Sequence, residues 1–159
     1  METKKNVEVS DAEIKAAVEV VEKIFGKGQT LKDIRGFDDA QMETIYSLGF
    51  NLYQSGRHED AEKVFKLLTL LDYSEVKYWL GFGAVQQAQR KFAQAVKSYA
   101  MGMMIDMHEP RLAYHAAECY LALGDKANAE SALLAVEEFA PATSEYRAKA
   151  AELKKSLAA

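Results

Sequence analysis

One pair of side chains has the types and the spacing to bind a metal ion or to activate a thiol. His115 and Cys119 lie four residues apart, so on a helix they would share one face. A zinc site needs further ligands, and the other histidines, His58 and His108, fall in separate parts of the chain. We therefore expect Cys119 to fill a contact between helices and His115 to lie beside the binding groove of the fold.

Methionines gather in a second segment that could hold a soft metal ion. Met101, Met103, Met104 and Met107 could supply thioether ligands to copper, or form an adaptable surface for a peptide. We expect them instead to pack as the apolar end of a helix, with peptide contact as the alternative. The sequence shows no catalytic constellation and no glycine-rich phosphate loop. The chain is therefore predicted not to be an enzyme, and to need no metal ion, nucleotide or other cofactor.

The composition is that of an ordinary globular domain. The chain has 159 residues, of which 49% are apolar and 28% charged, and only two prolines. A net charge of −4 without a basic patch argues against nucleic-acid binding, and no apolar run is long enough to insert into a membrane. The N-terminal sequence lacks an apolar signal segment, and the single Cys119 excludes an intramolecular disulfide. These features predict a protein of the reducing cytoplasm.

One pattern recurs three times along the chain, at a fixed period of 34 residues. It consists of a small residue, a second small residue twelve positions later and a large apolar residue four positions after that. The three copies are Gly49, Ala61, Phe65; Gly83, Ala95, Tyr99; and Ala117, Ala129, Leu133. This period and spacing resemble the tetratricopeptide repeat, a pair of helices joined by a turn. The predicted fold is therefore all-α, a tetratricopeptide-repeat solenoid of three helix–turn–helix repeats with an N-terminal helix and a C-terminal capping helix.

Capping signals and the repeat period set the limits of the predicted segments. Capping pairs are spaced three residues apart at Ser10–Glu13, Thr30–Asp33 and Asp38–Gln41, and Thr143 is placed to cap the last helix. We expect a disordered N-terminus at residues 1–9 and a single tetratricopeptide-repeat domain at 10–159. Its parts are an N-terminal helix at 10–25, repeats at 42–75, 76–109 and 110–143, and a capping helix at 144–157.

Small residues mark the close contacts within each predicted repeat. The paired small residues of the pattern are expected where the two helices cross, because a large side chain there would force the axes apart. Gly56 and Gly124 supply the turns of the first and third repeats. Arg90 takes this place in the second repeat, so the sequence signature of a tight turn is weaker there.

The first helix of each pair lines the concave face of such a solenoid. At the positions that face this groove in tetratricopeptide proteins, the chain has an aromatic cluster followed by small, apolar and polar residues. The candidate peptide-binding residues are Tyr46, Phe50, Tyr53, Leu80, Ala84, Gln87, Tyr114 and Glu118. Tyrosine offers apolar area with a polar tip, which suits a wet groove that grips an extended peptide. Alternatively, these aromatic side chains pack against the N-terminal helix or thicken the core.

The predicted N-terminal helix lies outside the repeats and carries a narrow apolar stripe. The stripe consists of Ile14, Ala17, Val18, Val21 and Phe25. It needs a partner, either the end of the solenoid or a second copy of the chain. The second possibility makes these five residues candidates for dimerisation.

Several segments outside the repeat consensus resemble the class II chaperones of bacterial type III secretion. They are Gly28-Gln-Thr-Leu-Lys-Asp-Ile, Ile45-Tyr-Ser-Leu-Gly-Phe-Asn-Leu-Tyr-Gln-Ser-Gly-Arg, Asp60-Ala-Glu-Lys-Val-Phe, Leu71-Asp-Tyr, Tyr78-Trp-Leu-Gly-Phe-Gly-Ala, and Glu109-Pro-Arg through His115-Ala-Ala-Glu-Cys. The resemblance covers roughly residues 28–139. His58 departs from it, because several relatives carry an aromatic or aliphatic residue there.

This resemblance implies a function. Such chaperones keep hydrophobic translocator proteins soluble in the bacterial cytoplasm before export, and bind a Pro-x-Leu-x-x-Pro segment in the groove. They are often homodimers, through the N-terminal helix or first repeat. By position, Tyr46, Phe50 and Tyr53 would form pockets for one end of the segment. The residues that would take the rest are Leu80, Ala84, Gln87 and Tyr114.

Two rival functions remain open from the sequence. One is a generic tetratricopeptide adaptor, which would bind a C-terminal carboxylate through basic groove residues; Lys77 and Arg111 are present at such positions. Against it, the aromatic cluster makes the groove apolar. The other is a regulatory role, in which the chaperone freed of cargo helps a transcriptional regulator, as some members of the family do.

Overall fold

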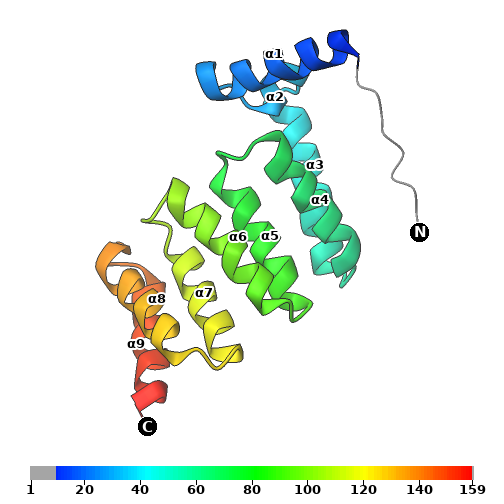
Figure 1. The fold of residues 1–159 in the computed structure, drawn as a ribbon. Helices are drawn as coiled ribbons and strands as arrows, with labels where there is room; N and C mark the ends of the chain where they lie inside the picture. The colour runs from blue at the N-terminus through cyan, green and yellow to red at the C-terminus, as the bar shows by residue number, and fades with distance from the viewer. Residues whose placement is uncertain (1–9, 159) are drawn as a thin grey trace, which may run out of the picture.

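In a computed structural model the chain is described over residues 10–158, except for the side chains of Ile24, Phe25 and Ala158. These residues form helices and no strands (Figure 1). The helices are α1 (Asp11–Lys27), α2 (Leu31–Arg35), α3 (Asp39–Gln54), α4 (His58–Leu71), α5 (Val76–Ala88), α6 (Phe92–Ile105), α7 (Pro110–Ala122), α8 (Lys126–Phe139) and α9 (Glu145–Ala158). The all-α prediction is confirmed, while the disorder predicted for residues 1–9 lies outside the described residues.

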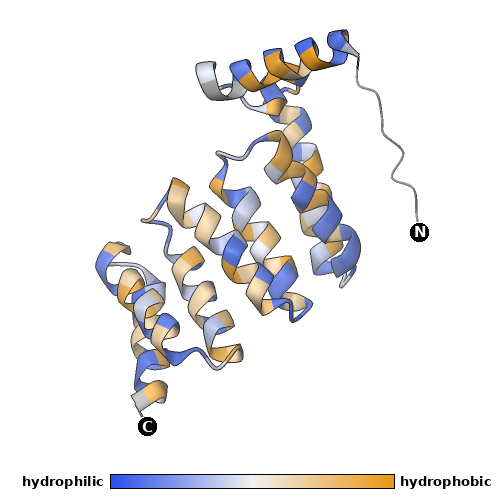
Figure 2. Cartoon of the chain, in the orientation of Figure 1, coloured by the Kyte–Doolittle hydropathy of each residue, from blue (hydrophilic) through white to orange (hydrophobic). Residues whose placement is uncertain are grey.

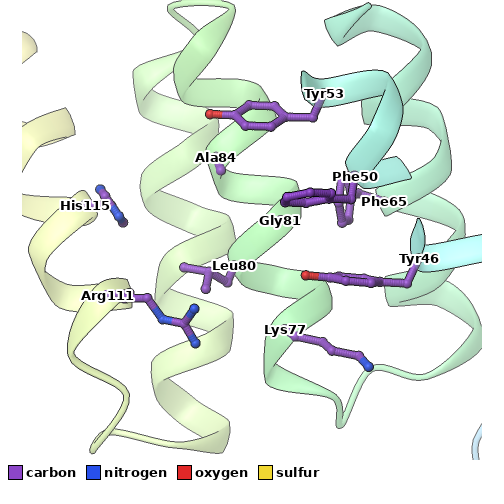
Figure 3. Close-up of a pocket in the computed structure, with 10 residues that line it drawn as sticks. All are labelled: Tyr46, Phe50, Tyr53, Phe65, Lys77, Leu80, Gly81, Ala84, Arg111 and His115. Carbon is purple, nitrogen blue, oxygen red and sulfur yellow. The ribbon is translucent and has the colours of Figure 1, made fainter. Parts of the chain in front are cut away.

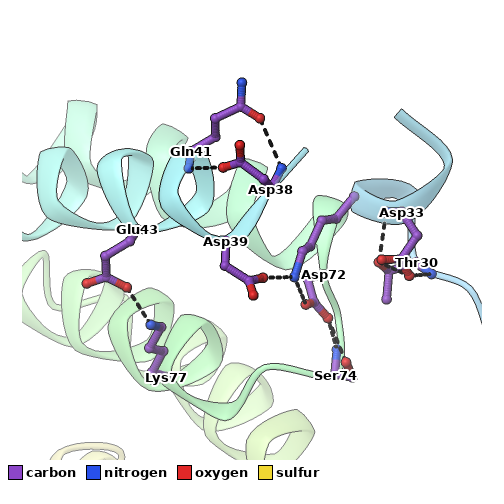
Figure 4. Close-up of polar contacts among 10 residues, drawn as sticks. Thr30, Asp33, Asp38, Asp39, Gln41, Glu43, Asp72, Ser74 and Lys77 are labelled. Atoms are coloured by element: carbon purple, nitrogen blue, oxygen red, sulfur yellow. Dashed lines mark hydrogen bonds and ion pairs between the residues drawn. The ribbon is translucent and has the colours of Figure 1, made fainter. Parts of the chain in front are cut away.

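The predicted helix starts are capped as the sequence indicates. Capping boxes form at the three predicted pairs, Ser10–Glu13, Thr30–Asp33 and Asp38–Gln41, the last two visible in Figure 4. In the third, the Gln41 backbone N–H donates to Asp38 Oδ1 at 2.7 Å, and the Asp38 N–H donates to Gln41 Oε1 at 3.0 Å. Two otherwise unpaired backbone donors are satisfied in each case, which fixes where the helix begins.

The last helix begins one residue later than predicted. Thr143 was expected as its cap, but α9 starts at Glu145, and the Tyr146 backbone N–H donates to Ser144 Oγ at 3.3 Å. Ser144 and Thr143 carry equivalent hydroxyls, and Ser144 is the one next to the helix. The prediction was therefore wrong about which of the two residues caps α9.

The three intra-repeat turns have one conformation, including the turn without a glycine. Gly56, Arg90 and Gly124 all adopt left-handed backbone angles, with φ of 77°, 60° and 76°. In each turn the next backbone N–H donates to a carbonyl five residues back, at 2.9, 2.8 and 2.9 Å. The second turn is therefore as tight as the other two, although its sequence signature is weaker. Arg90 is held in a conformation that glycine adopts at lower cost.

The helices α3 to α9 stack in sequence order into a curved array (Figure 1). Each consecutive pair is in contact, and three core clusters follow one another along the array. The pattern residues Ala61, Ala95 and Ala129 are fully buried, as is Tyr99. An added Cβ at Gly83 would fall under 3.0 Å from the Tyr99 ring, so the helix crossing predicted there is confirmed.

The methionine segment divides between core and surface. Met103 is half-buried between two core clusters, as expected of the end of a helix. Met101, Met104 and Met107 are exposed, Met104 to 82%. The prediction that all four pack into the core was wrong for these three.

Over residues 10–158, no helix is long and apolar enough to cross a membrane.

Candidate peptide-binding groove

The helices α3, α5 and α7 enclose a hollow of about 230 Å³ on one face of the array (Figure 3). Aromatic side chains from α3 form one wall, and α5 forms the floor. On the opposite side, α7 contributes Arg111 and His115. The lining residues are Tyr46, Phe50, Tyr53, Phe65, Lys77, Leu80, Gly81, Ala84, Arg111 and His115. A mostly apolar hollow with a few polar groups at its rim is the usual form of a binding site.

Most of the candidate residues predicted from the sequence lie together. Five of them, Tyr46, Phe50, Tyr53, Leu80 and Ala84, line the hollow. Gln87 and Glu118 line an adjoining hollow of about 330 Å³, which shares Tyr53, Ala84 and His115 with the first. The two hollows form one continuous groove, which we call the concave groove.

Tyr114 is the candidate that the structure places elsewhere. Its ring packs edge-on against Tyr146 of α9, with ring centroids 5.3 Å apart, and it is partly buried against the core cluster of α7, α8 and α9. Tyr114 lines neither of the two hollows. The repeat position that faces the groove elsewhere is covered in the last repeat, because α9 packs against this part of α7.

The aromatic wall is anchored to the core from behind. The Tyr46 ring meets Phe65 of α4 edge-on at 5.9 Å, and Phe65 is buried to 2% exposure. Phe65 can occupy this place because Gly81 has no side chain: a Cβ there would overlap the Phe65 ring. Phe50 remains 46% exposed. The wall thus combines a rigid base with an exposed apolar edge.

The N-terminal helix does not cover this wall. α1 contacts α2 and has no helix contact with α3, among the residues that the structure describes. One alternative reading of the aromatic residues, that they pack against the N-terminal helix, is therefore wrong. The other, a thickened core, holds in part for Tyr46 and Tyr53, which are partly buried against a core cluster, but not for the exposed Phe50.

The lysine and the arginine at the rim, Lys77 and Arg111, each already form an ion pair with a glutamate of the chain. Lys77 Nζ donates to Glu43 Oε2 at 2.7 Å (Figure 4) and lies 4.9 Å from the centre of the Tyr46 ring. The hydrogen bond that Lys77 donates to Glu43 raises the pKa of Lys77. Arg111 donates to both carboxylate oxygens of Glu109, at 2.8 and 2.7 Å. Each cation is already neutralised by a carboxylate of the chain, so a peptide carboxylate would have to compete with that partner, which disfavours a carboxylate-clamp adaptor.

A chain of polar side chains crosses the other end of the groove. Tyr99 Oη donates to Gln87 Oε1 at 2.7 Å, and Gln87 Nε2 donates to Glu118 Oε2 at 3.0 Å. His115 Nδ1 lies 2.8 Å from the same Glu118 oxygen. Because a carboxylate only accepts, this contact assigns the proton to Nδ1 of His115. The groove therefore changes from apolar to polar along its length.

Burial and hydrogen bonding set the charge states of the side chains in this hydrogen-bonded series. Burial raises the pKa of Tyr99 far above its usual value, so the hydroxyl stays a donor. Partial burial alone would raise the pKa of Glu118, but the hydrogen bonds from His115 and Gln87 outweigh it, and the pKa is lowered. Glu118 is thus a carboxylate at neutral pH.

Sequence reasoning missed the role of Tyr99, which it assigned only to the core. The signal was the twelve-residue spacing between Gln87 and Tyr99. The same spacing joins Ser98 to Gln86, where Ser98 Oγ donates to Gln86 Oε1 at 2.7 Å. The two helices of a repeat bring residues that are twelve positions apart into contact. Polar side chains at that spacing can therefore form a hydrogen bond with each other.

Cys119 is a core residue, as expected. Its side chain is fully buried, and burial raises the pKa of the thiol to about 12. No group of three or more His, Cys, Asp and Glu that could hold a metal ion occurs over residues 10–158. His115 lies at the groove, where it lines both hollows.

The helix α1 carries apolar residues along one side (Figure 2) and, among the described residues, its helix contacts are with α2 alone. Ile14, Val18 and Val21 are each about half exposed, at 50%, 49% and 51%, and Ala17 is exposed. The side chain of Phe25, the fifth predicted dimerisation residue, lies outside the described residues.

Comparison with known proteins agrees with this architecture. Tetratricopeptide-repeat family models match residues 83–153 and 42–74. The low calcium response locus protein H of Yersinia pestis is 39% identical over 127 residues, which cover 80% of this chain and 76% of that protein. The structure of the type III secretion translocator chaperone SycD from Yersinia enterocolitica is 38% identical and superimposes with a TM-score of 0.73, over 81% of this chain and 96% of that chain.

The chain belongs to the family of type III secretion translocator chaperones. Membership makes it a chaperone rather than an enzyme. A T3SS complex from Aeromonas hydrophila contains a chain that superimposes on this translocator chaperone with a TM-score of 0.82 at 37% identity, over 87% of this chain and 95% of that one. SycD has also been solved with a peptide of the translocator YopD, and in an alternative dimer.

Proposed function

We propose that this chaperone binds an extended segment of a hydrophobic translocator protein in the concave groove, and so keeps the translocator soluble and competent for secretion. The observation that carries the proposal is the hollow of about 230 Å³, open beside the half-exposed Phe50. SycD, a relative with the same fold, has been solved with a translocator peptide.

The shape of the groove suits a segment of the form Pro-x-Leu-x-x-Pro. The small residue Ala84 leaves room at the floor for an inserted leucine, beside the rings of Tyr46 and Tyr53. Prolines pre-organise the segment in an extended conformation, which lowers the entropy lost on binding. Apolar anchors on a pre-extended backbone are thus the ligand that this groove accommodates best.

A few buried anchors are enough to hold such a segment. Ordering an extended peptide costs about 2–5 kcal/mol, and fully burying a leucine-sized side chain contributes about 1.5–3 kcal/mol. Several such anchors together offset this ordering cost. Such binding needs no nucleotide, and the cargo can dissociate at the export apparatus.

We further propose that the cargo-free chaperone is a homodimer in the bacterial cytoplasm, joined through α1. The exposed stripe of Ile14, Val18 and Val21 supports this, because an apolar helix face without a partner is unfavourable in water. No feature of residues 10–158 favours the second implied role, help to a transcriptional regulator, over cargo binding.

The proposal is tested with a full-length translocator and the full-length chaperone expressed together. We expect the translocator to remain in the supernatant with the wild-type chaperone and to sediment with the Tyr53→Ala variant. Tyr73→Ala is the matched control, because Tyr73 is an exposed tyrosine outside the groove. Sedimentation of the translocator with the wild-type chaperone would contradict the proposal.

A further inference from the structure

Glu118 is an anionic group at the polar end of the concave groove. Its side chain is 35% exposed, and it lines the second hollow together with Tyr53 and Ala84. Both hydrogen bonds that the structure shows for this carboxylate, from Gln87 and from His115, are made by Oε2. The carboxylate is thus held in one orientation by its neighbours, with Oε1 left for a further donor.

Glu118 differs from the other carboxylates beside the groove. Glu43 is paired with Lys77 and Glu109 with Arg111, each at 2.7 Å. Within the described residues, the one ion-pair partner of Glu118 is His115, whose ring is charged only if protonated. Lys149 of α9 is near enough for its charge to help lower the pKa of Glu118, but its ion pair in the described residues is with Glu145, at 3.3 Å. A partly desolvated carboxylate without a lysine or arginine partner attracts a cation from elsewhere.

We propose that Glu118 binds a lysine or arginine side chain of the cargo segment, and that it thereby selects segments with a basic residue close to the apolar anchor. This inference rests on the proposed function, because it assigns a ligand to the same groove. Tyr53 and Ala84 line both hollows, so one continuous segment can fill the apolar hollow and reach Glu118.

The surroundings of Glu118 fit a basic side chain in particular. The aliphatic stem of a lysine can pack along Ala84 and Ala88, while its ammonium group reaches the carboxylate. Tyr53 places an aromatic ring in the same hollow, where a cation is also favoured. An acidic cargo residue would instead meet the negative charge of Glu118.

The test uses a series of fluorescent Pro-x-Leu-x-x-Pro peptides and the full chain. The parent peptide carries glutamine at the variable and flanking positions, and each further peptide replaces one glutamine with lysine. At one position we expect lysine to bind the wild type about fivefold more tightly than glutamine, as for a partly screened ion pair. In the Glu118→Gln variant this preference should fall below about twofold.

Two controls assign the effect to this one carboxylate. Glu43→Gln removes a carboxylate that is already paired, so the lysine preference should persist in that variant. Acetyl-lysine at the selected position keeps the stem and removes the charge, so in the wild type it should bind like glutamine. This second control uses only the wild-type protein, so it does not depend on whether a variant folds.

The possible outcomes separate this inference from the proposed function. Equal binding of the lysine and glutamine peptides to the wild type, or a preference that survives in Glu118→Gln, overturns the inference alone. Binding of no peptide in the series contradicts the groove as a peptide site and the inference with it. A preference that is lost in Glu118→Gln and with acetyl-lysine, but kept in Glu43→Gln, supports both.

Discussion

At the scale of single residues, the groove depends on glycines whose missing side chains make space for aromatic rings. The floor helix α5 carries Gly81 against the Phe65 ring and Gly83 against the Tyr99 ring. Both rings are buried, and the Tyr99 hydroxyl is tied to Gln87. Neither ring can yield without disturbing the aromatic wall or the polar chain of the groove.

We predict that Gly83→Ala destabilises the chaperone by about 1–3 kcal/mol, as overpacking does in a well-filled core. Gly49→Ala is the matched control, because a Cβ there would lie 3.1 Å from Val64 Cγ1 and 3.2 Å from the Phe65 ring, a milder contact than the one under 3.0 Å at Gly83. Alanine also favours a helix over glycine by about 1 kcal/mol, so this variant should be close to neutral.

Urea denaturation followed by circular dichroism measures both free energies of unfolding. A Gly83→Ala variant as stable as the Gly49→Ala variant would show that α5 and α6 are further apart than the structure places them.

At the scale of elements, the repeats tolerate a costly residue in one turn. Arg90 stands where the other two repeats have glycine, yet the backbone angles and the hydrogen bond of the turn are the same. The packing of α5 on α6 dictates the conformation of the turn, and the arginine is forced to follow. The sequence signal for a tight turn was absent here although the turn itself is present.

We predict that Arg90→Gly stabilises the fold by about 0.5–1 kcal/mol, since glycine removes the strain of a left-handed arginine at some cost in unfolded-state entropy. The reciprocal change, Gly124→Arg, should destabilise by about 1–2 kcal/mol. Melting temperatures and urea midpoints of the two variants should move in opposite directions. Shifts in the same direction would mean that the side chain at this position, and not the backbone, controls stability.

At the scale of the whole molecule, the N-terminal helix is the part that the single chain leaves incomplete. α1 is joined to the array through α2, and its apolar face has no partner within the described part of the chain (Figure 2). The proposed dimer would bury this face and leave the concave groove open, because α1 does not contact α3.

We predict that Val18→Asp converts a cargo-free dimer into a monomer without loss of helicity. Ala16→Asp is the control, since Ala16 is also exposed but lies on the opposite side of the helix from the stripe. Light scattering during size-exclusion chromatography gives the molar mass of each variant. Retention of the dimer mass in Val18→Asp would exclude the α1 stripe as the interface.

The sequence predicted the parts of this molecule that depend on periodicity and on local capping. The 34-residue pattern predicted the repeats and their small buried residues, and five of the eight groove candidates line one hollow. What it missed depends on contacts between distant segments. Tyr114 is covered by α9, the polar chain joins Tyr99 to Glu118 across two helix pairs, and Met104 lies exposed where the pattern suggested core.

The central claim is that the concave groove binds an extended apolar segment, and peptide titration tests it most directly. A fluorescent Pro-x-Leu-x-x-Pro peptide is titrated with the wild type, with Phe50→Ala and Tyr53→Ala, and with the control Tyr73→Ala. We predict micromolar binding by the wild type and the control, and at least about tenfold weaker binding by the two groove variants, as expected when an anchoring aromatic is truncated. Equal binding by all four proteins, or binding by none, would contradict the claim.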